Sequence, residues 1–274
     1  MRVVIFGLGY TGAALAQALL SLGHHVTGIT RANFYAPESF DKIIIASHII
    51  STVPPAEDGD AVLAHFATAL TASAANWIGY YSTTGVYGDR QGATVDESTP
   101  PAPGQPRSIR RLAAETAWRE MAAGRPLDIC RIAGIYGPGR SVFDDLSTGK
   151  ARRITRPKHF FGRIHIDDIV NLTIAAMHSA PTGTRILHFT DHRPAEPAEV
   201  TAYAAKLLEI DAPPLIPYEE AQKAMSPLAQ SFWAESRIVA NAKTLETLKT
   251  TLLYPSFREG LAAILAQNPP HDLA

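Results

Sequence analysis

The chain has 274 residues, with 25 lysine and arginine side chains against 26 aspartate and glutamate side chains, and 46% of its residues are hydrophobic. This is the composition of an ordinary globular protein, long enough for one large domain or two modest ones. The net charge near zero argues against a general nucleic-acid binder, no run is long and apolar enough to span a membrane, and the single cysteine, Cys130, excludes an internal disulfide and favours a reducing cytoplasm.

The first twelve residues carry the strongest motif. Residues 3–6 are an apolar run typical of a buried strand, and three glycines follow with the spacing G-x-G-x-x-G. A helical pattern and a second strand over 24–30 come next. In this context the glycines allow a tight turn, the approach of a pyrophosphate and close packing of helix on strand, and the first N–H groups of the helix face the phosphates. The motif assigns these residues to a dinucleotide: Gly7, Gly9, Tyr10, Thr11 and Gly12.

The end of the second strand bears on which dinucleotide is bound. A site for NAD usually has Asp or Glu about 20 residues past the glycine motif, to bind the ribose 2′-hydroxyl. Here the strand ends in Thr30 and Arg31, and no acid follows before Glu38. A guanidinium suits a 2′-phosphate through a charge-assisted contact. We therefore expect NADP. NAD is the alternative, with Arg31 then an ordinary surface residue.

Apolar periodicity predicts that strands and helices alternate along the rest of the chain. Residues 41–47 fit either a short helix or the start of a long strand. Further strands are expected at 48–53, 77–82, 127–132 and 185–190, and helices at 60–74, 108–123, 169–177, 196–208, 219–229 and 240–248, with a last helix after 254–260. Such alternation implies a parallel sheet with helices on both faces and ligands outside its C-terminal strand ends. By this rule Gly7, Thr52, Ser82 and Gly134 lie at one rim.

Four segments resemble those of extended short-chain dehydrogenases/reductases of the NAD(P)-dependent epimerase/dehydratase type. They are the glycine motif, Ser82–Gly88 with its Val-Tyr-Gly end, Arg131 with Tyr136-Gly137-Pro138-Gly139, and residues 163–169. The resemblance spans nearly the whole chain. It implies an α/β fold with a Rossmann-like, doubly wound parallel sheet over 1–140, to which 163–190 return. Residues 141–162 and 191–274 would form a smaller α/β substrate lobe.

The resemblance also implies catalytic positions, and here the chain departs from the family. The catalytic Ser or Thr of the family corresponds to Thr83. The Tyr-x-x-x-Lys dyad is missing, because Arg107 stands at the tyrosine position and Arg111 at the lysine position. A guanidinium stays protonated and cannot act as an acid/base near neutral pH. Tyr136, after the strand that lines the nicotinamide pocket in the family, is the first choice to replace the tyrosine.

The remaining expected contacts are with residues that should lie at or near the same rim. Arg111 is expected to hold a ribose or phosphate, and Arg107 an anionic group of the substrate. Besides the glycine loop, the expected cofactor contacts are Thr30, Arg31, Thr52, Ser82, Thr83, Arg111, Ile135 and Tyr136. The expected substrate contacts are Thr84, Arg107, Arg140, Ser141 and Arg163.

For the other polar and aromatic clusters, a purely structural interpretation is also available. The basic stretch 150–163 fits either a diphosphate site or a solvated loop. Asp167-Asp168 is expected to cap the helix that follows. His188 and His192 have no Cys pair or His-Glu-x-x-His motif beside them, so we expect no metal. Phe232 and Trp233 fit a substrate cleft, although core packing is the default for such residues.

Two functions are consistent with the sequence. The first is an NADP-dependent oxidoreductase, epimerase or dehydratase acting on a nucleotide sugar or similar polar carbonyl or hydroxyl compound, favoured by the preserved segment 82–84 and a full substrate lobe. The second is a catalytically silent NADP-binding redox sensor or regulatory protein, favoured by the missing dyad. We expect the enzyme, with a small-molecule substrate and no nucleic-acid or membrane partner. The family often dimerises through two helices of each subunit, which points to the helix at 108–123 for a homodimer.

Overall fold

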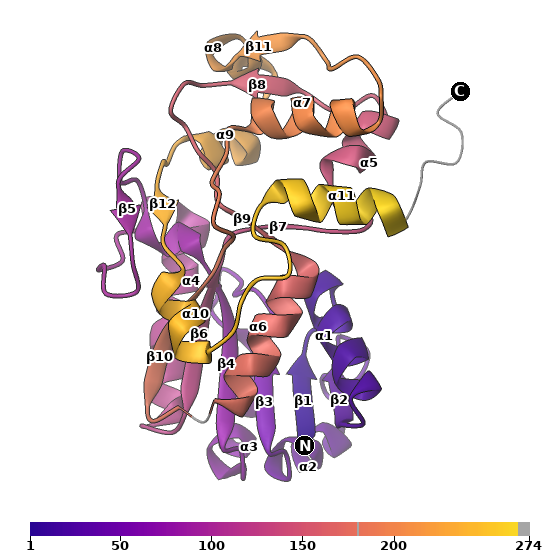
Figure 1. The fold of residues 1–274 in the computed structure, drawn as a ribbon. Coiled ribbons are helices and arrows are strands. Elements are labelled where there is room, and N and C mark those ends of the chain that lie inside the picture. The colour runs from indigo at the N-terminus through magenta and orange to yellow at the C-terminus, as the bar shows by residue number, and fades with distance from the viewer. Residues whose placement is uncertain (180, 268–274) are drawn as a thin grey trace.

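The computed structural model describes residues 1–179 and 181–267. Six parallel strands form the central sheet, in the spatial order β10-β6-β4-β3-β1-β2 (Figure 1). They are β1 (Arg2–Phe6), β2 (His25–Ile29), β3 (His48–Ser51), β4 (Trp77–Thr83), β6 (Leu127–Ile132) and β10 (Thr184–Phe189). The strand order reverses between β1 and β3, which is the switch point where ligands bind doubly wound sheets. The expected Rossmann-like α/β class is confirmed.

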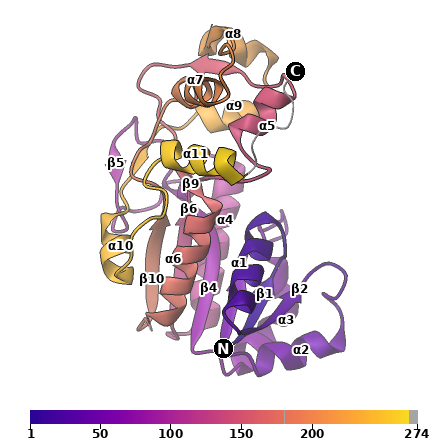
Figure 2. The ribbon, with the colours of Figure 1, turned by 45° about the vertical axis from the view of Figure 1, so that its right-hand side comes forward.

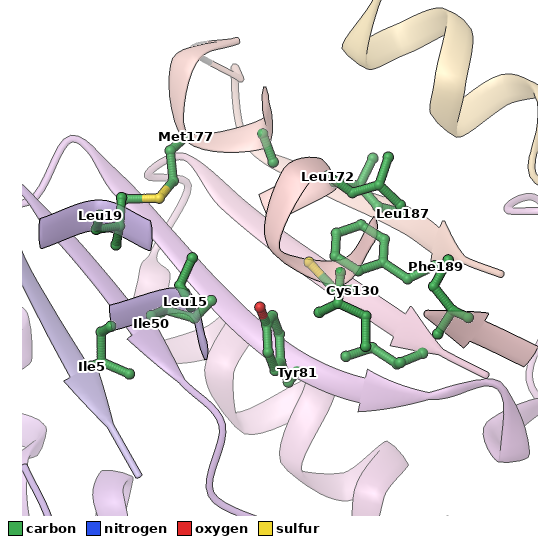
Figure 3. Packing of buried hydrophobic residues seen from close by; sticks show 14 of the residues in the cluster. Ile5, Leu15, Leu19, Ile50, Tyr81, Cys130, Leu172, Met177, Leu187 and Phe189 are labelled. Carbon is green, nitrogen blue, oxygen red and sulfur yellow. The ribbon is translucent and has the colours of Figure 1, made fainter. Parts of the chain in front are cut away.

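Helices cover both faces of the sheet, because its strands are apolar on both sides. One face carries α1 (Tyr10–Ser21) and α6 (Ile166–His178), and the other carries α2 (Pro37–Ile44), α3 (Ala61–Ala72) and α4 (Pro106–Ala122). The two layers are visible in Figure 2. In the first layer Leu19 of α1 meets Met177 of α6 above the strands (Figure 3). These two layers hold the carboxyl ends of the strands in fixed positions.

The tyrosine pair in β4 follows the alternation of a strand. Tyr80 points to the α4 side, where its ring stacks on Trp118 at a centroid distance of 5.5 Å. Tyr81 points to the other face, where its hydroxyl lies 2.7 Å from that of Thr173 on α6. Both rings are buried. Neither is therefore a surface group of the rim.

A smaller lobe stands above the carboxyl ends of the strands (Figure 1). Its core is formed by two groups of apolar side chains, one between helices and one beneath a two-stranded parallel sheet. The elements are α5 (Val142–Ser147), β8 (Arg153–Thr155), α7 (Pro197–Leu207), β11 (Leu215–Pro217), α8 (Tyr218–Ala221), α9 (Pro227–Trp233) and α11 (Phe257–Gln267). The lobe closes the rim of the sheet from above.

Part of the expected lobe segment 191–274 returns to the sheet. Helix α10 (Ala242–Leu248) packs beside β10 and α6, with Leu248 and Leu252 in the core of the sheet. Two pairs of short parallel strands connect segments that are distant in the sequence. They are β5 (Thr94–Val95) with β12 (Ile238–Val239), and β7 (Gly134–Tyr136) with β9 (Arg163–His165). The lobe is thus tied to the sheet at several points.

Two local expectations are wrong. The helix expected over 219–229 is interrupted: α8 ends at Ala221, a 3-10 turn η2 (Gln222–Ala224) follows, and α9 starts at Pro227, which lacks the N–H needed to continue a helix. The expected cap of α6 by Asp167-Asp168 is replaced by His165, whose Nδ1 accepts from the Asp167 N–H at 3.2 Å. The open question at 41–47 is resolved by α2, a helix that ends at Ile44. Over the described residues, no helix has both the length and the apolarity to cross a bilayer.

Candidate functional site

The glycine loop has the geometry that its sequence predicts. Gly7 follows β1 directly and has a φ of +85°, a backbone conformation that favours glycine. A Cβ on Gly12 would collide with the Gly7 carbonyl, so the close packing of α1 on the loop requires glycine there. Thr52, expected to contact the cofactor, instead donates its hydroxyl to the carbonyls of Phe6 at 3.1 Å and Gly7 at 2.9 Å. Its side chain, directly after β3, therefore holds the loop in place.

The N-terminus of α1 is open toward the rim. Gly9 is the N-cap residue and supplies no side-chain cap, no acidic residue occupies the first turn, and a Cβ on Gly9 would meet no atom within 4 Å. The N–H groups of the first turn have no partner inside a helix. Together with the partial positive charge of the helix end, they fit the diphosphate of a dinucleotide. Tyr10 and Thr11, which the sequence analysis assigned to the dinucleotide, lie in this first turn.

A short turn after β2 presents the expected determinant of cofactor choice. Asn33 holds this turn, since its Oδ1 accepts from the Thr30 backbone N–H at 2.6 Å and its Nδ2 donates to the Gly28 carbonyl at 3.0 Å. Arg31 is exposed at the tip. The Thr30 hydroxyl is engaged with Asn33 at 3.2 Å. The sequence analysis missed Asn33, although an Asn three residues after a strand end is a turn signal.

A cavity of about 800 Å³ lies at the carboxyl ends of β4 and β6. It is walled by the start of α4 on one side and by the lobe on the other. The expected site residues that line it are Thr83, Thr84, Arg107, Arg111, Ile135, Tyr136, Arg140 and Arg163. Side chains from four distant parts of the sequence therefore meet at one rim.

Three hydroxyl groups share the floor of this cavity. Thr83 Oγ1 accepts from the Gly85 N–H at 3.1 Å, which leaves its proton free to be donated. Thr84 and Ser108 are 8% and 2% exposed, and no side-chain hydrogen bond engages either hydroxyl within residues 1–179 and 181–267. A Cβ at position 85 would lie 2.7 Å from Ser108 Oγ and 3.3 Å from Thr83 Oγ1, so these oxygens approach the same point. The sequence analysis missed Ser108.

Arg111, at the lysine position of the family dyad, is built into the end of β4. Its Nη1 donates to the Tyr81 carbonyl at 2.9 Å and to the Tyr80 hydroxyl at 3.1 Å. Burial nevertheless raises the pKa of the Tyr80 hydroxyl, which Arg111 only partly offsets. The rest of the Arg111 guanidinium lines the cavity. It supplies a fixed positive charge rather than a titrating group.

The cavity is strongly cationic. Arg107 lies over the Phe232 ring at 3.7 Å, and Arg163 donates to the carbonyls of Phe161 at 2.8 Å and Ala195 at 3.0 Å. Neither guanidinium has an ion-pair partner among the described residues. The lining also includes Arg237, paired with the only acid of the described lining, Glu235, at 2.8 Å. The electrostatics of this lining favour an anionic ligand.

Tyr136, the first choice for the acid/base, is packed against the lobe in this structure. Its hydroxyl points away from the strand ends and donates to the Ser256 carbonyl at 3.4 Å, against Gly260 of α11. The side chain is buried, and burial raises the pKa of its hydroxyl well above the ordinary value. Tyr136 packs the lobe onto the sheet.

Two other expected contacts also have internal partners. Ser82 donates its hydroxyl to Glu115, a buried carboxylate held at 2.7 Å by the Nη2 of Arg131. Ser82 is therefore part of a buried polar group under α4 and not of the cofactor surface. Ser141 caps α5, where its Oγ accepts from the Phe143 N–H at 3.2 Å. It lines a neighbouring cavity of about 510 Å³ in the lobe, outside the rim cavity.

Comparison with known proteins gives relatives and fold neighbours, while no family model matches the chain. Protein YeeZ of Escherichia coli K12 is 29% identical over 252 residues, covering 77% of this chain and 85% of that protein. The 3-diazoavenalumate denitrifying reductase of a Streptomyces species is 25% identical over 307 residues, covering 95% of this chain and 99% of that protein.

Two solved structures are similar over nearly their whole lengths. A functionally unknown conserved protein from Silicibacter pomeroyi DSS is 34% identical, with a TM-score of 0.87 over 98% of this chain and 99% of that one. The human epimerase family protein SDR39U1 (isoform 2), solved with NADPH, is 19% identical, with a TM-score of 0.77 over 98% of this chain and 100% of that one.

Proposed function

Because this chain belongs to the same family as the Silicibacter pomeroyi protein and has the fold of the extended short-chain dehydrogenases/reductases of the epimerase/dehydratase type, we propose that it is an NADP-dependent enzyme. The reaction class is that of an oxidoreductase, epimerase or dehydratase. The substrate is a nucleotide sugar or a similar polar carbonyl or hydroxyl compound that carries negative charge.

One observation carries this proposal. The Thr83 hydroxyl, the open N-terminus of α1 and unpaired guanidinium groups surround one rim of the sheet, beside a cavity large enough for a small molecule. The NADPH named with the human epimerase family protein supports a nicotinamide cofactor. Arg31, exposed at the end of β2, favours NADP over NAD.

Each group of residues at the rim has a role that follows from its position. The first turn of α1 would hold the diphosphate and Arg31 the 2′-phosphate. When bound, the nicotinamide supplies or accepts a hydride. The hydroxyl groups of Thr83, Thr84 and Ser108 donate to the reacting oxygen and stabilise its developing negative charge. Arg107 and Arg163 attract the anionic part of the substrate. The chain thus offers fixed hydrogen-bond donors to the reacting oxygen, and when a carbonyl is reduced the proton that the oxygen takes up comes from water.

The second candidate function is a catalytically silent NADP-binding sensor. The observation that favours it is the lining of the rim cavity, where the described residues include no lysine and no tyrosine with a hydroxyl turned to the strand ends. A sensor and an enzyme would bind the cofactor alike. They differ in turnover, which the Thr83 variants described in the Discussion measure.

The experiment that tests the proposed function is calorimetric titration of the purified chain with NADPH and with NADH. NADPH is expected to bind at least about tenfold more tightly, since hydrogen bonds to charged groups contribute about 1.5–3 kcal/mol. Substitution Arg31→Gln should remove most of this preference and leave NADH binding unchanged. If neither dinucleotide binds the wild-type chain, the proposed function is wrong.

A further inference from the structure

The turn Gly137-Pro138-Gly139-Arg140 lies against the glycine loop, although more than 120 residues separate them in the sequence. The turn is closed by two backbone hydrogen bonds, from Gly137 N to the Arg140 carbonyl at 3.2 Å and from Arg140 N to the Gly137 carbonyl at 3.0 Å. It leaves β7 and leads directly into α5. The turn therefore stands between the cofactor loop and the lobe.

Tyr10, the first residue of α1, fastens the turn to the loop. Its hydroxyl donates to the Pro138 carbonyl at 3.0 Å. A Cβ at position 137 would lie 2.5 Å from this hydroxyl, so the approach depends on Gly137. The residue that opens the diphosphate-binding helix thus also fixes the position of the turn.

Arg140 places a positive charge beside Tyr10, at the start of α1. Its guanidinium lies 5.6 Å from the centre of the Tyr10 ring, and its side chain is exposed. Within the described chain its guanidinium has no hydrogen-bond or ion-pair partner. The acid nearest in sequence, Asp144, is engaged by the Ser141 N–H at 2.6 Å and the Ser141 hydroxyl at 2.9 Å. The Arg140 guanidinium thus has all its donors available beside the open end of α1.

We propose that Arg140 binds the diphosphate of the dinucleotide and closes the cofactor site from the side of the lobe, with Tyr10 as its platform. This inference rests on the proposed function, and it reassigns Arg140 from the substrate to the cofactor. A diphosphate carries two negative charges, and the first turn of α1 offers only backbone N–H groups and a partial charge. A guanidinium supplies the missing full charge and a forked pair of donors.

The test is calorimetric titration of the full chain with NADPH, NADH and ADP-ribose, which keeps the diphosphate but lacks the nicotinamide and the 2′-phosphate. Arg140→Gln is expected to weaken all three by the same factor, roughly tenfold to a hundredfold, and to flatten the salt dependence of NADH binding. Arg140→Lys, which keeps the charge but loses the fork, should lie between. Tyr10→Phe, which loses the bond to Pro138, should weaken all three by a few fold.

The controls separate this inference from the proposed function. Arg119→Gln removes an exposed arginine of α4 that lines neither cavity and should bind like the wild type. Unchanged affinity of Arg140→Gln for NADH and ADP-ribose, with a wild type that binds both, overturns the inference and leaves the proposed function standing. A loss confined to NADPH also overturns it, because Arg140 would then contact the 2′-phosphate. A wild type that binds no dinucleotide overturns both.

Discussion

Thr83 is the side chain on which the proposed chemistry depends most. Its oxygen accepts from the Gly85 N–H, so its remaining hydrogen-bonding capacity includes the donated proton that a developing oxyanion needs. Ser108 and Thr84 add two further hydroxyl groups at the same floor. Tyr136, by contrast, keeps its hydroxyl against α11. A difference of orientation thus separates a candidate catalytic group from a packing group in one cavity.

Paired substitutions test this division. Thr83→Val is expected to lower NADPH-dependent turnover at least about a hundredfold, the usual cost of removing one oxyanion donor, and Thr83→Ser should restore most of it. Tyr136→Phe should leave turnover within a few fold of the wild type. The measurement is NADPH oxidation with any substrate that the wild type reduces, with folding checked by circular dichroism. Wild-type turnover in Thr83→Val would contradict the catalytic role of Thr83. Loss of turnover in Tyr136→Phe would contradict the packing role of Tyr136.

Helix α1 and its loop show how one element serves both stability and binding. Gly12 is in contact with the Gly7 carbonyl, while the space around Gly9 is open. The two glycines therefore do different work, although the motif lists them together. Gly12 is needed for the packing of the helix, and Gly9 for the approach of a ligand. The same element receives the 137–140 turn through Tyr10.

Alanine substitutions should separate these roles. Gly12→Ala is expected to destabilise the chain by about 1–3 kcal/mol, the usual cost of overpacking, and to abolish NADPH binding. Gly9→Ala should leave the free energy of unfolding nearly unchanged but weaken NADPH binding, since the added methyl group occupies only ligand space. Urea denaturation and calorimetric titration give the two readouts. A Gly9→Ala variant as unstable as Gly12→Ala would contradict this division of roles.

The junction of sheet and lobe is a feature of the whole molecule, and it buries acidic groups. Asp168 accepts from the N–H groups of Leu253 at 2.6 Å and Tyr254 at 3.1 Å, and burial raises its pKa to about 6. Asp191, after β10, is 2% exposed, and its Oδ2 has no hydrogen-bond partner in the described structure. Burial raises the pKa of Asp191 to about 7, against the attraction of Arg163. The junction is therefore sensitive to pH.

The sign of this effect follows from linkage. The folded state of a carboxyl with a raised pKa binds more protons than the unfolded state, so its contribution to stability falls as pH rises from about 4 to 7. Asp191→Asn removes this contribution. Its stability should match the wild type near pH 4 and exceed it at pH 8 by on the order of 4 kcal/mol, since burial raises the pKa of Asp191 from 3.8 to about 7 and one pKa unit corresponds to about 1.4 kcal/mol. Urea denaturation at both pH values measures the difference. An equal effect at pH 4 and pH 8 would show that Asp191 acts by packing alone.

The sequence by itself determined the parts of this protein that depend on neighbouring residues. The glycine loop, the strands of the sheet and the opposite faces of Tyr80 and Tyr81 follow from spacing and alternation, which are local properties of the backbone. The rim of strand ends followed from these, and with it the position of Thr83. The break at Pro227 was equally local, and the breaker signal of proline was available to find it.

Only the tertiary structure decided which side chains meet at the rim and which turn away. Tyr136 points to α11 because Gly260, 124 positions later in the sequence, leaves room for it, and no local pattern records such a contact. Ser108 became a candidate through its approach to Gly85, and Arg140 through its place over the Tyr10 ring. Burial, free donors and raised pKa values depend on atoms brought together from distant segments. They are therefore fixed by packing and not by the order of residues in any one segment.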